Sequence, residues 1–275
     1  MPNESIIRLS VFVGVLVAMA LWEAIAPRRQ LSISKPMRWF SNLGIVVLNT
    51  VVLRLVFPLA AVGVATVATE RGWGLFNVVS LPYWQVIVLS VIALDCIIYL
   101  QHVMFHALPT LWQLHKVHHA DRDFDVTTGL RFHPLEIMLS MGIKIAAVLL
   151  LGSPPVAVIV FEILLNATAM FNHGNVGLPP QLDRVLRLFL VTPDMHRIHH
   201  SVIPQETNSN FGFNLPWWDY LFGTYRDRPS TSQQTMTIGL SEYQKNLQVE
   251  KLHGMLLLPF LGTPSGYAID RDETK

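Results

Sequence analysis

Long apolar runs separated by short polar links dominate the first two thirds of the chain. The hydrocarbon core of a bilayer, about 30 Å thick, needs roughly 20 mostly apolar residues in one helix. Three runs meet this requirement, at residues 6–26, 39–66 and 83–106. A fourth block, residues 135–171, is interrupted at Gly152-Ser153-Pro154-Pro155, and its two halves of about 17 residues are short for full spans. We predict that these halves form a helical hairpin that enters the bilayer and returns.

Composition favours a membrane protein. The chain has 275 residues, of which 51% are hydrophobic and 14% are charged, whereas an average soluble domain has about 25% charged residues. We predict an all-α, multi-pass protein with about four transmembrane helices and a cytoplasmic, helical, histidine-rich cap. We expect residues 1–94 to form the N-terminal transmembrane helices and loops. Residues 95–228 would form a histidine-rich domain that includes the hairpin, and residues 229–275 a C-terminal cytoplasmic or membrane-surface tail.

Charge and cysteine content exclude several classes of function. The net charge of +1 provides no basic field, so we expect no nucleic-acid partner. Cys96 is the only cysteine, which excludes an intrachain disulfide framework, a cysteine-based zinc site and an iron–sulfur cluster. Any metal must therefore be held by histidine or carboxylate side chains.

The orientation follows from the charges in the links. The link after the first run is basic, whereas the link between the second and third runs has Arg71 beside Glu70. Basic links remain in the cytoplasm, so the third run should end there, and the hairpin should return the chain to the same side. The basic residues of the first link are Arg28, Arg29, Lys35 and Arg38.

Histidines provide the candidate chemistry. His-x-x-His-His occurs twice, as HKVHHA at 115–120 and HRIHHS at 196–201, and ten of the eleven histidines lie between His102 and His200. Positions i, i+3 and i+4 span about 100° on a helix, so each motif can direct three imidazoles to one side. A single histidine is more often a buried hydrogen-bonding group, but nine in four short groups suit two metal ions with open positions. The duplication predicts that each copy of the motif contributes to a separate centre. Iron, zinc and copper all accept imidazole.

Other polar residues are candidates for supporting roles. In DCIIYLQHVMFH, Asp95, Tyr99, His102 and His106 fall within about 60° on one helical face. We expect Asp95 and Tyr99 to orient a ligand or relay protons; alternatively, Asp95 only pairs with a buried polar group such as Arg54.

Four polar residues after the last histidine group are candidates to hold imidazoles by hydrogen bonds, and Asp219 is the preferred one. The interfacial Arg131 is a contact for a lipid headgroup or for a carboxylate, or it is a plain membrane anchor. The four candidates are Asn208, Asn210, Asn214 and Asp219.

The motifs HVMFH, HKVHHA, FNHGNV and DMHRIHHS, followed by NSNFGFNLPWWDYLFGTYR, resemble those of the integral-membrane fatty acid hydroxylase / sterol desaturase superfamily over residues 95–226. The resemblance implies an oxidoreductase with two iron ions (Fe2+/Fe3+) that uses O2 to hydroxylate or desaturate a membrane lipid such as a sterol or fatty acyl chain. No glycine-rich dinucleotide, haem or flavin motif is seen, so an external reductase or redox carrier is expected. The implied ligands are His102, His106, His115, His118, His119, His173, His196, His199 and His200.

The sequence leaves alternatives for the last ligand and for the class of function. His173 stands alone where some members of the superfamily have a second histidine, so water, Asn175 or His133 is a candidate for the remaining coordination position. A zinc-dependent membrane hydrolase would also cluster histidines, but no His-Glu-x-x-His motif supports it. A metal-binding membrane protein without catalysis is a further alternative, although a transporter would place its ligands along a path through the bilayer.

Overall fold

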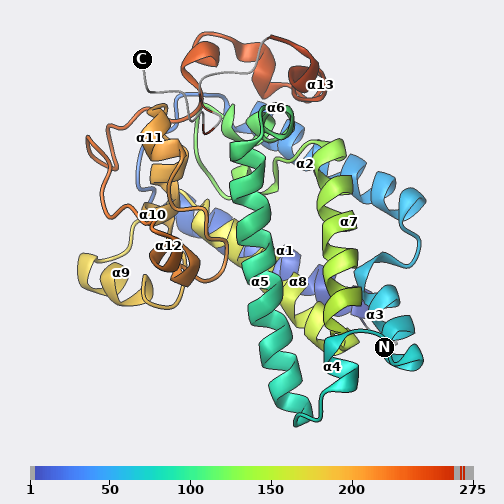
Figure 1. Ribbon diagram of the computed structural model, residues 1–275. Coiled ribbons are helices and arrows are strands. Elements are labelled where there is room, and N and C mark those ends of the chain that lie inside the picture. Colours follow the sequence, from blue (N-terminus) through green and yellow to red (C-terminus); the bar gives the residue numbers. More distant parts are fainter. Residues whose placement is uncertain (1–3, 263–266, 268, 270–275) are drawn as a thin grey trace, which may run out of the picture.

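The computed structural model describes residues 4–262, 267 and 269. Within these residues every regular element is helical and no β-strand is present, which confirms the predicted all-α class. Figure 1 shows the long helices α5 and α7 running down the molecule, and short helices and loops that lie above them or beside the upper part of α5, among them α6, α10, α11 and α13. We call this region of short elements the cap.

Five helical segments are long and apolar enough to cross a membrane, which indicates a multi-pass membrane protein. The first and third apolar runs each form one helix. The second run is divided at Phe57-Pro58-Leu59 into α2 and α3, because proline lacks the N–H needed to continue a helix. The helices of this region are α1 (Glu4–Ile25), α2 (Lys35–Val56), α3 (Ala60–Arg71), α4 (Leu75–Val78), α5 (Tyr83–Ala107), α7 (Pro134–Leu151) and α8 (Pro155–Asn172).

The fourth apolar block folds as two helices of 18 residues, α7 and α8, joined at the expected turn. Gly152 ends α7 in a left-handed conformation with φ 67°, and Pro155 begins α8. Gly74 lies so close that a Cβ atom on it would be 2.2 Å from the Gly152 nitrogen. The α3–α4 link therefore packs against the turn of the hairpin, and only glycine fits there.

The cap consists of short elements whose ends are set by proline. Pro109, Pro193 and Pro204 each stand at the start of a helix, where their missing N–H is not needed. The α-helices of the cap are α6 (Pro109–His119), α9 (Pro180–Leu186), α10 (Pro193–His199), α11 (Pro204–Thr207), α12 (Trp217–Phe222) and α13 (Leu252–Leu257). The 3-10 helices are η1 (Thr128–Leu130), η2 (Ser241–Tyr243), η3 (Leu247–Glu250) and η4 (Leu258–Phe260).

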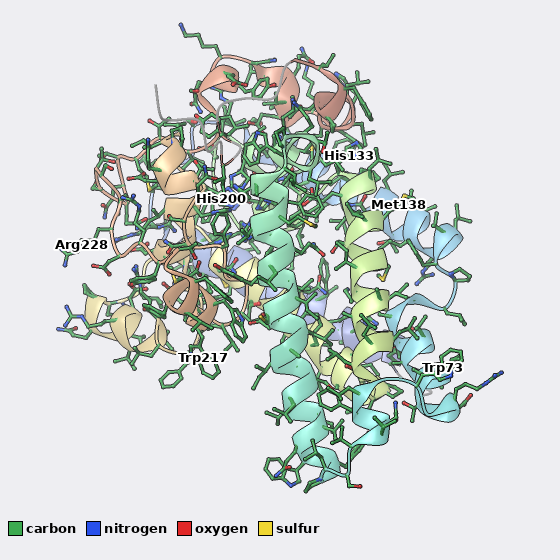
Figure 2. All side chains as sticks on the ribbon, viewed as in Figure 1. Trp73, His133, Met138, His200, Trp217 and Arg228 are labelled. Atoms are coloured by element: carbon green, nitrogen blue, oxygen red, sulfur yellow. The ribbon has the colours of Figure 1, made fainter. Side chains whose placement is uncertain are left out.

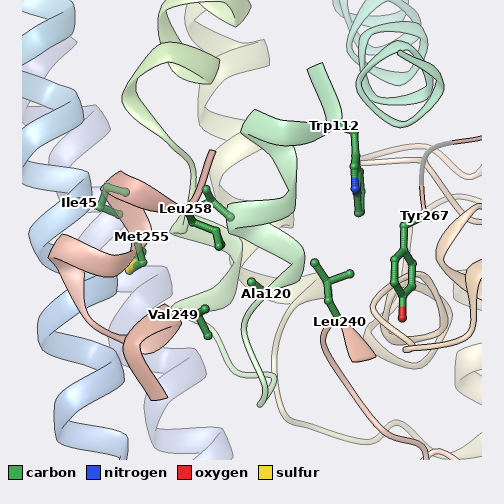
Figure 3. Close-up of a cluster of buried hydrophobic side chains, with 9 residues drawn as sticks. Ile45, Trp112, Ala120, Leu240, Val249, Met255, Leu258 and Tyr267 are labelled. Carbon is green, nitrogen blue, oxygen red and sulfur yellow. The ribbon is translucent and has the colours of Figure 1, made fainter. Parts of the chain in front are cut away.

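The C-terminal segment packs onto the cap and onto α2. Met255 and Leu258 are buried in one apolar cluster with Ile45 of α2 and Trp112 of α6 (Figure 3). The ring of Trp112 stacks on that of Tyr267 at 6.1 Å between centroids. Part of the segment LHGMLLLPFLG thus covers the helix that carries the HKVHHA motif.

Buried ion pairs fix the same region. The Arg131 side chain is fully buried and donates to the Val117 carbonyl at 2.8 Å and to the Glu250 carboxylate at 2.8 Å. Arg131 therefore contacts a carboxylate of the protein itself, and its interpretation as a lipid-headgroup contact or a membrane anchor is wrong, because its charge is neutralised inside the cap. Arg38 is also buried and pairs with Asp121 and Asp125.

Candidate metal centre

The nine histidines come together in the cap as two adjacent groups. In each group every residue offers one ligand atom, and these atoms lie within 4.8 Å of one another. All nine side chains are buried. Figure 2 shows His200 in the interior of the upper half, whereas His133 lies at the top of α7. One group contains His102, His106, His115, His119 and His199; the other contains His118, His173, His196 and His200.

Each His-x-x-His-His motif contributes to both groups, so the expectation that each copy serves one centre is wrong. His115 and His119 belong to the group of five, whereas His118 belongs to the group of four. In the second copy, His196 and His200 belong to the group of four, whereas His199 belongs to the group of five. The reason is helical geometry: positions i and i+4 are about 40° apart on a helix, whereas i+3 lies about 60° to the other side.

Hydrogen bonds fix the tautomers of several rings. The Nδ1 atoms of His102, His173 and His199 lie 2.7 Å, 2.7 Å and 2.8 Å from the backbone carbonyls of Phe211, Ala169 and Ser209. A carbonyl can only accept, so each of these rings carries its proton on Nδ1. Their Nε2 atoms therefore present lone pairs to the interior of the groups.

His173 shows why these lone pairs fit a metal ion. Its Nε2 lies 3.1 Å from the Nε2 of His118, 3.1 Å from that of His196 and 3.2 Å from that of His200. One lone pair cannot satisfy three neighbours by hydrogen bonding. Imidazole nitrogens bound about 2.1 Å from one ion, at angles of 90° to 110°, would be about 3.0 to 3.4 Å apart. The spacing therefore fits shared coordination.

The group of five has the same character. The Nε2 atoms of His102 and His115 lie 3.1 Å apart, and so do those of His106 and His119. The Nε2 of His199 is buried and has no hydrogen-bond partner among the described residues. An ion at this point would satisfy nitrogens that the protein alone leaves unpaired.

Burial keeps the cap histidines neutral, as metal binding requires. It lowers the pKa of His115 and of His173 to about 3. Burial and, secondarily, the neighbouring imidazoles hold the pKa of the remaining cap histidines well below the usual range. These remaining histidines are His118, His119, His196, His199 and His200.

Glu136 is a functional candidate that the sequence analysis did not single out. Its Oε1 lies 2.6 Å from His115 Nδ1, while its buried Oε2 has no partner among the described residues. A carboxylate on the second nitrogen of a ligating histidine fixes the ring and raises its basicity. A long loop separates His115 from Glu136, so no periodic pattern in the sequence predicts that the two side chains meet.

Asp95, Tyr99 and Asp219 lie around the loop after the last histidine group, and among the described residues none of the three forms a hydrogen bond with a histidine. Asp95 accepts from Asn214 Nδ2 and Trp218 Nε1, both at 2.8 Å, and does not pair with Arg54. The Tyr99 hydroxyl lies 2.9 Å from Thr224 Oγ1.

Asp219 contacts a histidine only indirectly, through the backbone of Phe211. Its carboxylate accepts from the backbone N–H groups of Phe211 at 2.8 Å and Gly212 at 2.9 Å, and the Phe211 carbonyl accepts from His102. Burial raises the pKa of Asp219 to about 6. Asp219 therefore holds the loop that orients His102.

The remaining candidates have separate roles. Asn208 accepts from His106 Nδ1 at 3.1 Å, whereas the side chain of Asn210 bonds to the Met195 and Arg226 carbonyls. Both side-chain ends of Asn175 bond to the backbone of Arg29, and the ring of His133 caps α7 by accepting from the Leu135 N–H. His133 belongs to neither histidine group, and both side-chain ends of Asn175 are occupied, so the structure gives no support to either as the missing ligand.

A cavity of about 730 Å³ reaches the histidines from between α1, α2, α5, α7 and α8. His102, His115 and Glu136 line one part of it, together with Phe105 and Phe213. This volume is typical of sites for small-molecule ligands. The cavity therefore gives an apolar molecule access to the edge of the group of five.

Known proteins with similar sequences modify lipids. The chain is 30% identical over 153 residues to ornithine lipid hydroxylase OlsE of Rhizobium tropici, covering 55% of this chain and 45% of that protein. It is 27% identical over 202 residues to the alkylglycerol monooxygenase of Xenopus tropicalis, covering 70% of this chain and 42% of that protein. It is 30% identical over 138 residues to the Delta(7)-sterol-C5(6)-desaturase of Nicotiana tabacum, covering 47% of this chain and 45% of that protein.

The matched part spans less than half the length of each of these relatives. No solved structure matches the chain. The fatty acid hydroxylase family model matches residues 87–224, which include all nine clustered histidines and half of the chain. The chain therefore belongs to the fatty acid hydroxylase family, within the superfamily that its histidine motifs resemble.

Proposed function

We propose that the protein is an oxidoreductase that hydroxylates or desaturates a membrane lipid with O2 at a pair of iron ions. The observation that carries this proposal is the convergence of closely spaced imidazole nitrogens at two adjacent points beside a cavity between membrane-spanning helices. Family membership and the lipid hydroxylase, monooxygenase and desaturase activities named for the relatives support it.

The two groups of histidines would each hold one iron ion, and the ions would supply O2 activation and cleavage of an unactivated C–H bond, with electrons from an external reductase. The protein orients the ligand rings and keeps water away from the reacting carbon. Glu136 and the Phe211 carbonyl fix the rings of His115 and His102. Phe105 and Phe213 line the cavity beside these rings and exclude water from the reacting carbon.

The proposed orientation places the histidines on the cytoplasmic side. The basic link between α1 and α2 lies directly on the cap, because Arg28 pairs with Asp194 at 2.7 Å and Ser32 N–H donates to Asp123 at 2.8 Å. The charged link and the histidines therefore share one side of the membrane. Basic links favour the cytoplasm, where an external reductase has access.

Metal analysis of the detergent-purified protein tests the proposal. We expect about two irons per chain in the wild type. His118→Ala removes a residue of the group of four and His199→Ala a residue of the group of five, so each variant should lose about one iron. His253→Ala is the matched control, because His253 is exposed and belongs to neither group.

Lipid oxidation by the iron-loaded protein, given O2 and a chemical reductant, should fail in both cluster variants and persist in His253→Ala. Lipid hydrolysis by the protein loaded with zinc alone would replace the proposal with the hydrolase alternative. Iron bound at full stoichiometry without any lipid oxidation would favour a metal-binding protein without catalysis.

A further inference from the structure

Charged side chains line the end of the cavity that lies away from the histidines. Glu162 of α8 pairs with Arg8 of α1 at 2.7 Å and with Lys144 of α7 at 2.8 Å. Arg8 also pairs with Glu4 at 3.0 Å. All four line the same cavity as His102 and His115. We call Glu4, Arg8, Lys144 and Glu162 the ion quartet.

The quartet lies at a defined distance from the metal centre. Lys144 follows Glu136 by eight residues on α7, which is about 12 Å at 1.5 Å per residue. Glu162 and Lys144 are nearly buried, with side-chain exposures of 5% and 11%. Charged groups at such positions in membrane-spanning helices are costly, and a functional role is the usual reason that they are present.

A purely structural role does not account for the charge balance. Arg54 also lines the cavity and has no hydrogen-bond or ion-pair partner among the described residues. Among the charged residues that line the cavity, Glu136 belongs to the metal centre, where it bonds to His115. The remaining charged residues are three cations, Arg8, Arg54 and Lys144, and two carboxylates, Glu4 and Glu162. One positive charge is left without a counter-charge from the protein.

We propose that this end of the cavity binds an anionic group, a carboxylate or a phosphate, of an amphipathic lipid whose chain extends toward the histidines. The excess positive charge attracts the anion, and arginine and lysine are the usual donors to both groups. An uncharged hydrocarbon end would leave the excess charge without a partner.

This inference rests on the proposed function only in treating the lipid as a substrate. It predicts that the carbon presented to the metal centre lies about 12 Å from the anionic group. Lipids without such a group would be poor substrates. Binding itself does not require iron.

Equilibrium binding of three radiolabelled probes with the same chain tests the inference: hexadecyl phosphate, hexadecanoic acid and hexadecanol. The full-length protein is held in phosphatidylcholine nanodiscs at pH 7.5. We expect at least one of the two anionic probes to bind about tenfold more tightly than hexadecanol, and the better of them identifies the group. The same measurement on His199→Ala separates lipid binding from metal chemistry, because the preference for the anion should persist there.

Three variants provide the controls. Arg54→Gln should weaken binding of the anionic probe about tenfold and leave binding of hexadecanol unchanged. Glu162→Gln adds to the excess of positive charge, so it should strengthen binding of the anionic probe. Arg71→Gln is the matched control, because Arg71 is an exposed arginine on α3 that does not line the cavity. Equal binding of all three probes, or identical behaviour of Arg54→Gln and Arg71→Gln, would overturn the inference. Since Arg54 is exposed, this comparison holds even if Glu162→Gln misfolds.

Discussion

Mild acid should unfold the metal-free cap. The cap histidines are buried and neutral in the folded protein, but in the unfolded chain they take up protons near pH 6.5. Their folded-state pKa is lowered, so their contribution to stability is complete above pH 6.5 and is lost as the pH falls toward 3. The expected window of destabilisation is therefore between pH 6.5 and pH 3.

The magnitude follows from proton linkage. Between pH 7.5 and pH 5.5, a histidine that protonates only when unfolded removes about 1.4 kcal/mol of stability. His115 and His173, each with a pKa of about 3, together remove about 2.7 kcal/mol. The other five cap histidines shift in the same direction and add to this loss. Asp219, whose pKa is raised to about 6, acts in the opposite direction but offsets only about 1 kcal/mol.

The assay is thermal unfolding of chelator-treated protein in detergent, followed by tryptophan fluorescence at the two pH values. A loss of about 2.7 kcal/mol corresponds to a fall in the unfolding midpoint of at least about 5 °C. His253→Gln should show the same fall, because that side chain is exposed. A midpoint that is equal at pH 7.5 and pH 5.5 would refute the claim that the cap holds neutral, buried imidazoles.

Two further predictions concern residues around the metal centre. Glu136→Gln should weaken iron binding by roughly tenfold to a hundredfold in a chelator competition, because the carboxylate that fixes His115 is lost; the exposed Glu242→Gln should have no effect. Gly129→Ala should lower the iron content, because its Cβ would lie 2.5 Å from the Ala169 carbonyl and 3.0 Å from His173 Nδ1. Gly142→Ala is the control and should retain full iron, because nothing lies within 4 Å of a Cβ at that position. Equal iron content in both variants would contradict the packing argument.

The sequence allowed the helices and the clustering of histidines to be predicted, because hydrophobic length and i, i+3, i+4 spacing are local signals. The break of the second apolar run at Pro58 is also a local signal, although the length of the run by itself does not reveal it. The distribution of each His-x-x-His-His motif over two groups required the angular positions of the residues and the placement of both helices. Three histidine rings are fixed by backbone carbonyls, those of Phe211, Ser209 and Ala169. Every residue has a backbone carbonyl, so the sequence cannot reveal which ones take this role.

The arrangement of ligands has a consequence for the order of assembly. His118 and His173 are 55 residues apart, and His173 and His196 are 23 residues apart. Bringing such separated segments together costs loop-closure entropy, and without an ion the facing lone pairs repel one another. Metal binding would then act as a cross-link in a chain that has a single cysteine. We expect the transmembrane helices to form first and the inserted metal to stabilise a cap that is only marginally stable without it, so that iron supply limits the yield of mature protein in the membrane.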